Sequence, residues 1–221
     1  LRDSREIDRK KRRLAIENGF EYVMFYEDEI KNNTLKVFKT ISSKLRREPK
    51  IKVRPQKLVF KKVDKKDIEG FLNNNHYIGS ASAKYYFAAY FNDIIVGAML
   101  FGQPTRQNID GIELKRFCVH NDYEIYGLGS WMLKRAFENG VTKPIVSYSD
   151  NRLHNGELYK KLGFKKVGES RQDYYWTKDN KRYHKSSLRK PKECDITETE
   201  LRTAQNYHRI WDLGKTKWIL D

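Results

Sequence analysis

The chain has 221 residues, a formal net charge of +16 and a pI near 9.7. Hydrophobic residues make up 38% of it, which is enough for one sizeable domain and a smaller piece, and this excludes a largely disordered chain. No apolar run in the sequence is long enough to cross a bilayer, so the basic surface predicts nucleic acid as the partner and no membrane. Charge that serves only solubility is the alternative.

The two cysteines, Cys118 and Cys194, lie far apart and fit neither a zinc spacing nor a disulfide framework. This usage predicts a reducing, cytoplasmic setting. The opening stretch is basic and lacks the hydrophobic core of a signal peptide, and the first residue is Leu1. We therefore expect either a fragment of a longer protein or an unconventional start.

The first 47 residues predict a helix, a strand and a helix, over residues 4–18, Glu21 to Tyr26 and Thr34 to Leu45. The second helix would carry its apolar side chains on one face, namely Leu35, Phe38, Ile41 and Leu45. Such a unit buries too little apolar surface to stand alone and must lean on another domain. Its acids at 27–29 are expected to begin a helix, because neighbouring side chains on a strand end diverge, and no metal site is predicted.

A basic linker over residues 48–56, with prolines at both ends, leads into a larger domain that we place at residues 57–221. Within it we expect Asp64 as a helix N-cap, a hairpin turning at Asn92 and Asp93, and a third strand from Ile112 to Val119. The tail predicts a capped helix from Thr197 and a closing hairpin around Gly214 that completes the sheet edge. The architecture is α/β, a mixed sheet flanked by helices with a helix-strand-helix appendage.

The stretch from Leu158 to Phe164, read as a short helix capped by Gly163, resembles the last conserved block of the GNAT superfamily of N-acetyltransferases. Packing alone could place the same residue types at these positions. The resemblance implies a mostly antiparallel, splayed GNAT-like sheet. It also implies that Tyr159 matches the tyrosine that protonates the departing thiolate in that superfamily.

A second feature is the helix start at Tyr126, where exposed N–H groups and the helix dipole favour an anion. By the GNAT resemblance, Gly127, Gly129 and Ser130 would hold the pyrophosphate of an acyl-coenzyme A, or another acyl donor, and Asn155 would assist. Two departures put that site in doubt. Glu124 stands where the superfamily has Gln or Arg, and Arg152 stands where it usually has Asn. A tight connection between strand and helix is the structural alternative for the two glycines.

A narrower resemblance spans roughly residues 73–183 and rests on His76-Tyr77, on the strand from Glu113 to Phe117, and on Ser147 to Asp150 with its flanking residues. These segments resemble the Mom-like DNA-modification proteins of phages such as Mu, which implies a phage protein acting in a bacterial cell on the exocyclic amine of adenine. The run from Asn18 to Ile30 resembles the C-terminal end of endonucleases related to very-short-patch repair and of phage homing endonucleases.

Acyl transfer to an aromatic amine needs a base, an orienting group and an acid for the leaving group. Asp150 or His76 is the candidate base, Arg116 the orienting group and Tyr159 the acid. Each has a plainer role available: a turn or cap for Asp150, a loop position for His76, and an ion pair for Arg116.

Duplex DNA would have to present a flipped base, because a stacked base cannot reach such a pocket. Several aromatic and basic side chains are candidates for contacts with the nucleic acid, namely Arg152, Tyr174, Tyr175, Lys181, Arg182 and Lys185. The aromatic ones would stack on bases, although sheet packing explains them equally well. The stretch from Arg182 to Lys192 is expected to be a solvated basic arm.

The sequence leaves three functions to be tested. They are an acyltransferase that modifies a DNA base, the DNA-binding part of a homing endonuclease with a catalytically silent GNAT scaffold, and a GNAT enzyme acting on a small amine or protein. The oligomeric state is left open.

Overall fold

The structure, a computed structural model, describes residues 4–45, 49–105 and 110–221. These residues form two compact units. The first comprises the chain up to Val37 with Ser149–Gly156 and Gly168–Thr216, and the second comprises Phe38–Tyr148, Glu157–Val167 and Lys217–Asp221. The domain division predicted from the sequence follows other boundaries, one of which lies at residue 47 outside the described residues, and it stays a prediction.

The second unit is built on a seven-stranded sheet with the order β2-β3-β4-β5-β7-β12-β8. The strands are β2 (Val59–Lys62), β3 (Tyr85–Phe91), β4 (Ile94–Gly102), β5 (Ile112–Val119), β7 (Ile145–Asp150), β12 (Lys215–Leu220) and β8 (Lys165–Glu169). Neighbours from β2 to β5 pair antiparallel, whereas β5 and β7 pair parallel. The predicted turn at Asn92 and Asp93 is confirmed, since both residues have positive φ, at 47° and 62°.

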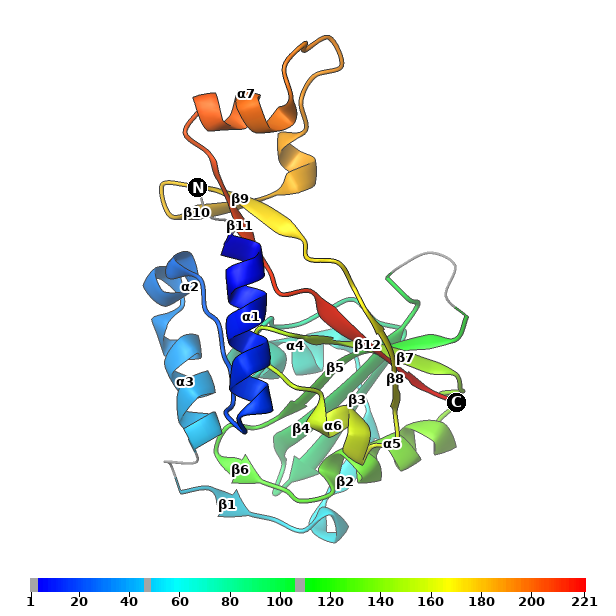
Figure 1. The fold of residues 1–221 in the computed structure, drawn as a ribbon. Helices are drawn as coiled ribbons and strands as arrows, with labels where there is room; N and C mark the ends of the chain where they lie inside the picture. Colours follow the sequence, from blue (N-terminus) through cyan, green and yellow to red (C-terminus); the bar gives the residue numbers. More distant parts are fainter. Residues whose placement is uncertain (1–3, 46–48, 106–109) are drawn as a thin grey trace. The chain divides into compact units, whose positions relative to one another are not determined.

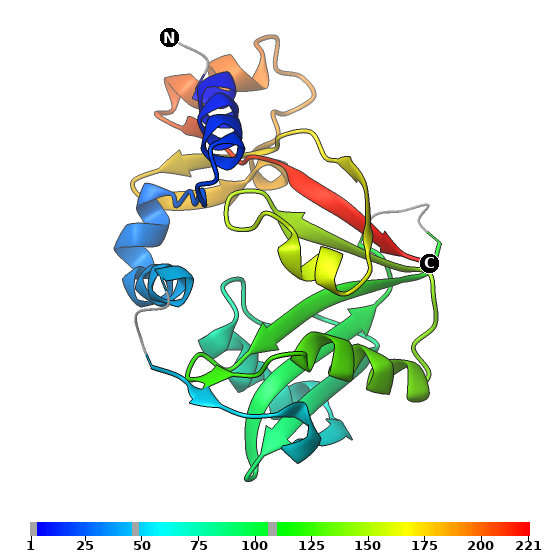
Figure 2. The ribbon, with the colours of Figure 1, turned by 60° about the horizontal axis from the view of Figure 1, so that its bottom comes forward.

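Two helices cover opposite faces of this sheet, α4 (Lys65–Asn75) and α5 (Leu128–Glu138) (Figure 1). Successive β3 residues alternate between them because strand side chains point to opposite faces. Phe87 packs in the cluster that contains Met132 of α5, and Ala88 in the cluster that contains Ile68 of α4. Figure 2 shows α5 laid across the antiparallel strands. The mixed α/β sheet flanked by helices is therefore confirmed.

Shorter elements complete the second unit. They are the two-residue strands β1 (Ile51–Lys52) and β6 (Tyr123–Glu124), the 3₁₀ turn Pro55–Lys57, and the short helix α6 (Glu157–Lys161). Asp64 caps α4 as predicted, in a capping box in which the amide of Asp64 donates to Asp67 Oδ2 over 3.0 Å. Gly163 ends α6 with a φ of +83°, as the predicted left-handed cap requires.

The first unit contains α1 (Ser4–Glu17), α2 (Glu27–Asn32), the start of α3 (Thr34–Leu45), α7 (Glu198–Ala204) and a second sheet. That sheet has the order β10-β9-β11, from the strands β10 (Lys181–His184), β9 (Tyr174–Lys178) and β11 (His208–Trp211). Asp179 and Asn180 turn the β9–β10 hairpin with positive φ, as predicted. Within the described ranges, no helix combines the length and the apolar character needed to cross a membrane.

Three local predictions were wrong. Glu21 to Tyr26 forms no strand, and the amide of Met24 donates to the carbonyl of Arg152 instead of to a neighbouring strand. β11 and β12 are no hairpin, because they belong to different sheets, and β12 lies inside its sheet with Trp218 only 2% exposed.

The predicted solvated arm from Arg182 to Lys192 begins instead as strand β10 and the 3₁₀ turn Lys185–Leu188. The expectation that the N-terminal helices lean on another domain stays a prediction. Leu35 and Phe38 of α3 stay 65% and 57% exposed.

Candidate active site

The parallel strands β5 and β7 of the second unit pair over only two residues on each strand. Ile112 lies opposite Ile145, and Glu113 opposite Val146. At the next position the hydroxyl of Ser147 donates to the carbonyl of Leu114 over 2.8 Å, so a side-chain hydrogen bond replaces the backbone hydrogen bond between the two strands. A backbone carbonyl buried at this point needs such a partner. The strands therefore separate beside a buried serine.

Tyr159 brings its phenol to this point from α6. Its hydroxyl lies 2.9 Å from Ser147 Oγ and 3.4 Å from the carbonyl oxygen of Tyr148. Its ring stacks on Trp218 with centroids 5.3 Å apart and meets Phe164 edge-on at 5.5 Å. Two aromatic neighbours fix the ring, so the hydroxyl is held where the strands separate.

Burial raises the pKa of Tyr159, and the hydrogen bond with Ser147 opposes this only in part. A negative charge at Glu113 raises the pKa further, while Arg116 lowers it. The phenol consequently keeps its proton across the neutral range. Such a group is suited to donate a proton and poorly suited to accept one.

Arg116 lies on β5 and is directed to backbone carbonyls. Its Nε donates to the carbonyl of Gly79 over 3.0 Å and its Nη1 to that of Lys115 over 2.6 Å. Burial lowers its pKa, and the charge of Glu113 acts against that shift. Arg116 therefore holds the loop after α4, a role that sequence reasoning did not foresee.

His76 sits in that same loop as the C-cap of α4. Its amide donates to the carbonyl of Leu72 over 2.9 Å, and its Nδ1 accepts from the amide of Ile78 at 3.2 Å. With Nδ1 accepting, the neutral ring carries its proton on Nε2. His76 and Arg116 are thus tied to one loop, His76 by its own position in it and Arg116 through Gly79.

Glu113 is a residue that sequence reasoning left out of the site. It is 9% exposed, and its Oε2 accepts from the amide of Thr105 over 2.6 Å. Lys115 Nζ lies 3.7 Å from the same oxygen. A carboxylate inside a predicted strand was the available signal, because a buried charge is rare without a partner. Its charge acts on both Arg116 and Tyr159.

The start of α5 has the form expected for anion binding. Gly127 is the N-cap with a φ of +77°, and an added Cβ there would meet nothing within 4 Å. Gly129 differs, since a Cβ would come 3.1 Å from Leu162 Cδ2, so close packing accounts for that glycine. Ser130 is exposed. Gly127 is the glycine whose surroundings leave room for a ligand.

Glu124 was expected to repel a pyrophosphate bound there. Its Oε1 accepts from the hydroxyl of Tyr126 over 2.6 Å, and Lys52 Nζ lies 4.0 Å from its Oε2. A hydrogen bond and a nearby cation both reduce the repulsion that this carboxylate exerts on an anion.

Asp150 belongs to the first unit, where it is paired with Arg152. Its Oδ1 accepts from the amide of Arg152 at 3.0 Å and its Oδ2 from Arg152 Nη2 at 3.1 Å. Arg152 Nη1 also donates to Glu29 Oε2 over 3.0 Å. Burial lowers the pKa of Arg152, but the charges of Asp150 and Glu29 outweigh burial and raise it overall. The predicted convergence of Asp150 with Tyr159 and Arg116 stays a prediction.

The residues predicted to contact DNA are in part committed to internal pairs. Arg152 is 7% exposed, and Arg182 Nη2 donates to Asp28 Oδ1 over 2.7 Å. Both guanidinium groups stack on the ring of Tyr26 at 4.4 Å. Two of the six residues predicted to contact DNA are therefore held by internal partners.

The other four predicted contacts belong to β9, β10 and the turn after it. Lys185 Nζ pairs with Asp173 Oδ1 at 2.7 Å, and the hydroxyl of Tyr174 donates to Glu198 over 3.0 Å. Tyr175 is half-buried, with its ring centroid 6.0 Å from that of His184. Lys181 is exposed, and so is Asn155, the predicted helper at the donor site. In the described part of the chain, no group of three His, Cys, Asp or Glu residues could hold a metal ion.

Comparison with known proteins gives one family match. Residues 82–166 match the model described as an acetyltransferase (GNAT) domain, a segment that runs from before β3 into β8 and includes Glu113, Gly127, Ser147 and Tyr159. The comparison with curated protein sequences gives no match.

Among solved structures, the chain is similar to the IAA acetyltransferase from Bacillus cereus ATCC 14579, with 15% identity over 74% of this chain and 98% of that one and a TM-score of 0.43. It is similar to a GNAT family acetyltransferase from Elizabethkingia anophelis with acetyl-CoA bound, with 14% identity over 75% and 98% and a TM-score of 0.40. It is also similar to the GNAT family acetyltransferase from Streptococcus pneumoniae, with 20% identity over 51% of this chain and 87% of that one and a TM-score of 0.39.

Proposed function

We propose that this chain, which carries a GNAT acetyltransferase domain over residues 82–166, transfers an acyl group to an amine of a base in DNA. The observation that carries the proposal is the buried phenol of Tyr159, held 2.9 Å from Ser147 Oγ where β5 and β7 separate. A fixed, protonated hydroxyl at a gap in a sheet is suited to protonate a leaving group.

The donor in this proposal is an acyl-coenzyme A. The N–H groups of Gly129 and Ser130 at the start of α5 would hold its pyrophosphate, because the first amides of a helix lack partners within the helix, whereas the amide of Leu128 already donates to the carbonyl of Ile125. The open surroundings of Gly127 and the hydrogen bond from Tyr126 to Glu124 support the fit. When bound, the donor supplies an activated thioester carbonyl and a sulfur leaving group.

The protein's own residues supply the proton chemistry. As the amine nitrogen bonds to the acyl carbon and the carbon–sulfur bond breaks, Tyr159 gives its phenolic proton to the sulfur. The proton that the amine loses goes to water, since His76 in the loop after α4 has its Nδ1 occupied by the amide of Ile78 and carries its own proton on Nε2. Arg116 positions that loop through Gly79. The charge of Glu113 helps to keep Tyr159 protonated.

DNA is the proposed acceptor because of charge and because of the sequence resemblance to Mom-like phage proteins. A net charge of +16 on 221 residues attracts polyanions. The base would be flipped from the duplex, which costs a few kcal/mol.

A DNA-binding protein with a silent GNAT scaffold is the second candidate. The position of Glu124 beside the α5 start favours it, since a carboxylate there weakens binding of a pyrophosphate even when it is hydrogen bonded.

The test is an assay with the purified chain, acetyl-coenzyme A and duplex DNA, followed by release of free thiol and by mass spectrometry of the digested nucleosides. The proposal expects thiol release together with a modified adenine, and neither with Tyr159→Phe. DNA binding without either signal would favour the silent scaffold. Thiol release with a small amine or a peptide but not with DNA would refute DNA as the acceptor.

A further inference from the structure

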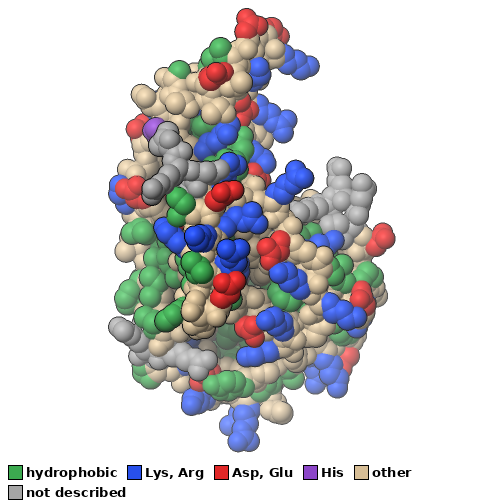
Figure 3. Space-filling model, viewed as in Figure 1, with side chains coloured by type: hydrophobic (Ala, Val, Ile, Leu, Met, Phe, Trp, Pro, Cys, Tyr) green, Lys and Arg blue, Asp and Glu red, His purple; other side chains and the backbone are tan. Residues whose placement is uncertain are grey.

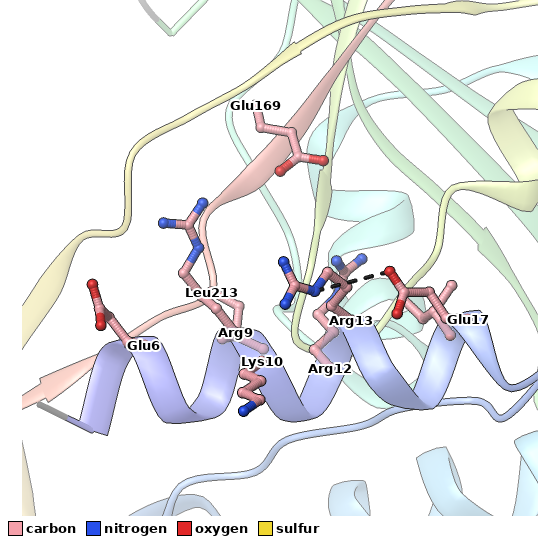
Figure 4. Close-up of a pocket in the computed structure, with 9 residues that line it drawn as sticks. Glu6, Arg9, Lys10, Arg12, Arg13, Glu17, Glu169 and Leu213 are labelled. Carbon is pink, nitrogen blue, oxygen red and sulfur yellow. Dashed lines mark ion pairs between the residues drawn. The ribbon is translucent and has the colours of Figure 1, made fainter. Parts of the chain in front are cut away.

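A groove lined by four cationic side chains and the three carboxylates of Glu6, Glu17 and Glu169 runs along α1 in the first unit. It has a volume of about 730 Å³, and α1 supplies most of its lining, with Glu169 and Leu213 on the other side. Lys and Arg side chains gather on the molecular surface over α1 (Figure 3). In the close-up, Arg9, Arg12 and Arg13 project from the helix to the side on which Glu169 lies (Figure 4). Neither the sequence prediction nor the GNAT site uses this groove.

The cations of the groove differ in their partners. Arg12 donates from Nε to the carbonyl of Asn151 over 2.8 Å, so it anchors the helix. Arg9 and Lys10 form no hydrogen bond or ion pair with any residue that the structure describes. Arg13 lies 3.9 Å from Glu17, with both side chains more than half exposed. Exposed pairs of this kind contribute little, so Arg13 stays available to a stronger anion.

Spacing and chemistry favour a phosphate chain as the occupant. Arg9 and Arg13 are four residues apart and lie one above the other on one helix face. The planar guanidinium group binds phosphate oxygens through two parallel hydrogen bonds. Two such groups in a row along an open groove fit successive phosphates of a nucleic acid strand better than a single compact anion.

We propose that the α1 groove binds the phosphate backbone of duplex DNA through Arg9 and Arg13. This inference rests on the proposed function, in which DNA is the acceptor, and it adds a binding surface outside the GNAT domain. Contacts to phosphates carry no sequence information and fix position and affinity. Glu169 faces the same groove, so its carboxylate opposes the bound phosphates and limits how tightly they are held.

The experiment measures the affinity of the full chain for a labelled DNA duplex at salt concentrations from about 50 to about 200 mM. The variant Arg9→Gln/Arg13→Gln removes the two guanidinium groups that are proposed to bind phosphates. The matched control Lys39→Gln/Lys134→Gln removes the same charge at two exposed positions on other helices. A third variant, Glu169→Gln, removes the opposing carboxylate.

The groove variant should weaken binding on the order of tenfold at the low-salt end and reduce the log-log salt slope by about 1.8, at roughly 0.9 per phosphate contact. The control should leave the slope unchanged, and Glu169→Gln should strengthen binding. If the unaltered chain binds DNA and the groove variant binds with the same slope, the inference is overturned while the proposed function stands. If the unaltered chain shows no salt-dependent binding, both the inference and DNA as the acceptor fail.

Discussion

The hydroxyl groups of Ser147 and Tyr159 lie 2.9 Å apart, and Ser147 at the same time donates to the carbonyl of Leu114. With its proton used on that carbonyl, Ser147 accepts the hydrogen bond from Tyr159. The phenol is therefore aimed by a buried serine at the place where β5 and β7 separate. The proposed acyl transfer uses this hydroxyl as its proton donor.

Replacing Tyr159 by Phe should remove activity without unfolding the protein. The rings of Trp218 and Phe164 keep their aromatic neighbour, and Leu114 keeps its hydrogen bond from Ser147. We expect kcat to fall by about 10²- to 10⁴-fold, the usual contribution of a positioned proton donor. Steady-state rates and a thermal melt measure both effects, with Tyr207→Phe as the control. A normal rate in the Tyr159 variant would show that the phenol has no part in the reaction.

The pKa shift of Tyr159 predicts how stability changes with pH. Because burial raises its pKa in the folded protein, the unfolded chain ionises first, at about pH 10. The stabilising contribution is complete below that pH and is lost as the pH rises through the folded pKa. Urea unfolding between pH 8 and 11 should show a decline that is smaller in Tyr159→Phe. Equal declines in both proteins would mean that the phenol is already solvated in the folded state.

The pair formed by Arg152 and Glu29 predicts a large cost when one partner is removed. Their side chains are 8% and 10% exposed, and Asp150 shares the same guanidinium. Arg152→Met should lower the free energy of unfolding by about 3–5 kcal/mol, because it leaves Asp150 without its counter-charge and leaves Glu29 with Arg182 as its one remaining cation among the described residues. Adding Glu29→Gln should recover part of that loss. Urea titrations of the single and double variants test this, and additive losses would argue against coupling.

The two glycines at the start of α5 should respond differently to alanine. Gly127→Ala meets no neighbour but forces a left-handed residue, at a cost of about 1–2 kcal/mol. Gly129→Ala presses on Leu162, which is in the turn after the helix that carries Tyr159. We expect Gly127→Ala to raise KM for the acyl donor, and Gly129→Ala to lower kcat by displacing α6. The reverse assignment would move the donor site away from Gly127.

The two cysteines should differ in reactivity. Burial raises the pKa of Cys118 to about 12, so its thiol stays protonated at neutral pH, whereas Cys194 is partly accessible. Only the thiolate reacts with alkylating reagents. Brief treatment of the native protein with iodoacetamide should therefore label Cys194 alone, as peptide mass spectrometry can show. Labelling of Cys118 without denaturant would contradict the burial of that strand.

Local signals were sufficient for much of the fold. The turn at Asn92 and Asp93, the caps at Asp64 and Thr197, and the left-handed Gly163 all lie within a few residues of the elements they bound. Propensities and caps act over such short distances, so the sequence alone reveals them.

Pairings between distant segments could not be inferred in this way. Arg152 and Glu29 are 123 residues apart, and alternation in one segment does not reveal its partner. β12 lies between β7 and β8, and its Trp218 stacks on Tyr159, which no local pattern of the tail indicates. Glu113 was missed for the same reason, since its effect on Tyr159 depends on tertiary structure.

The account depends most on transfer of an acyl group that requires the phenol of Tyr159. The most direct measurement is mass spectrometry of nucleosides from duplex DNA incubated with acetyl-coenzyme A and either the unaltered chain or Tyr159→Phe. The account predicts an acylated adenine with the unaltered chain and none with the variant. The same yield of modified base from both proteins would contradict it.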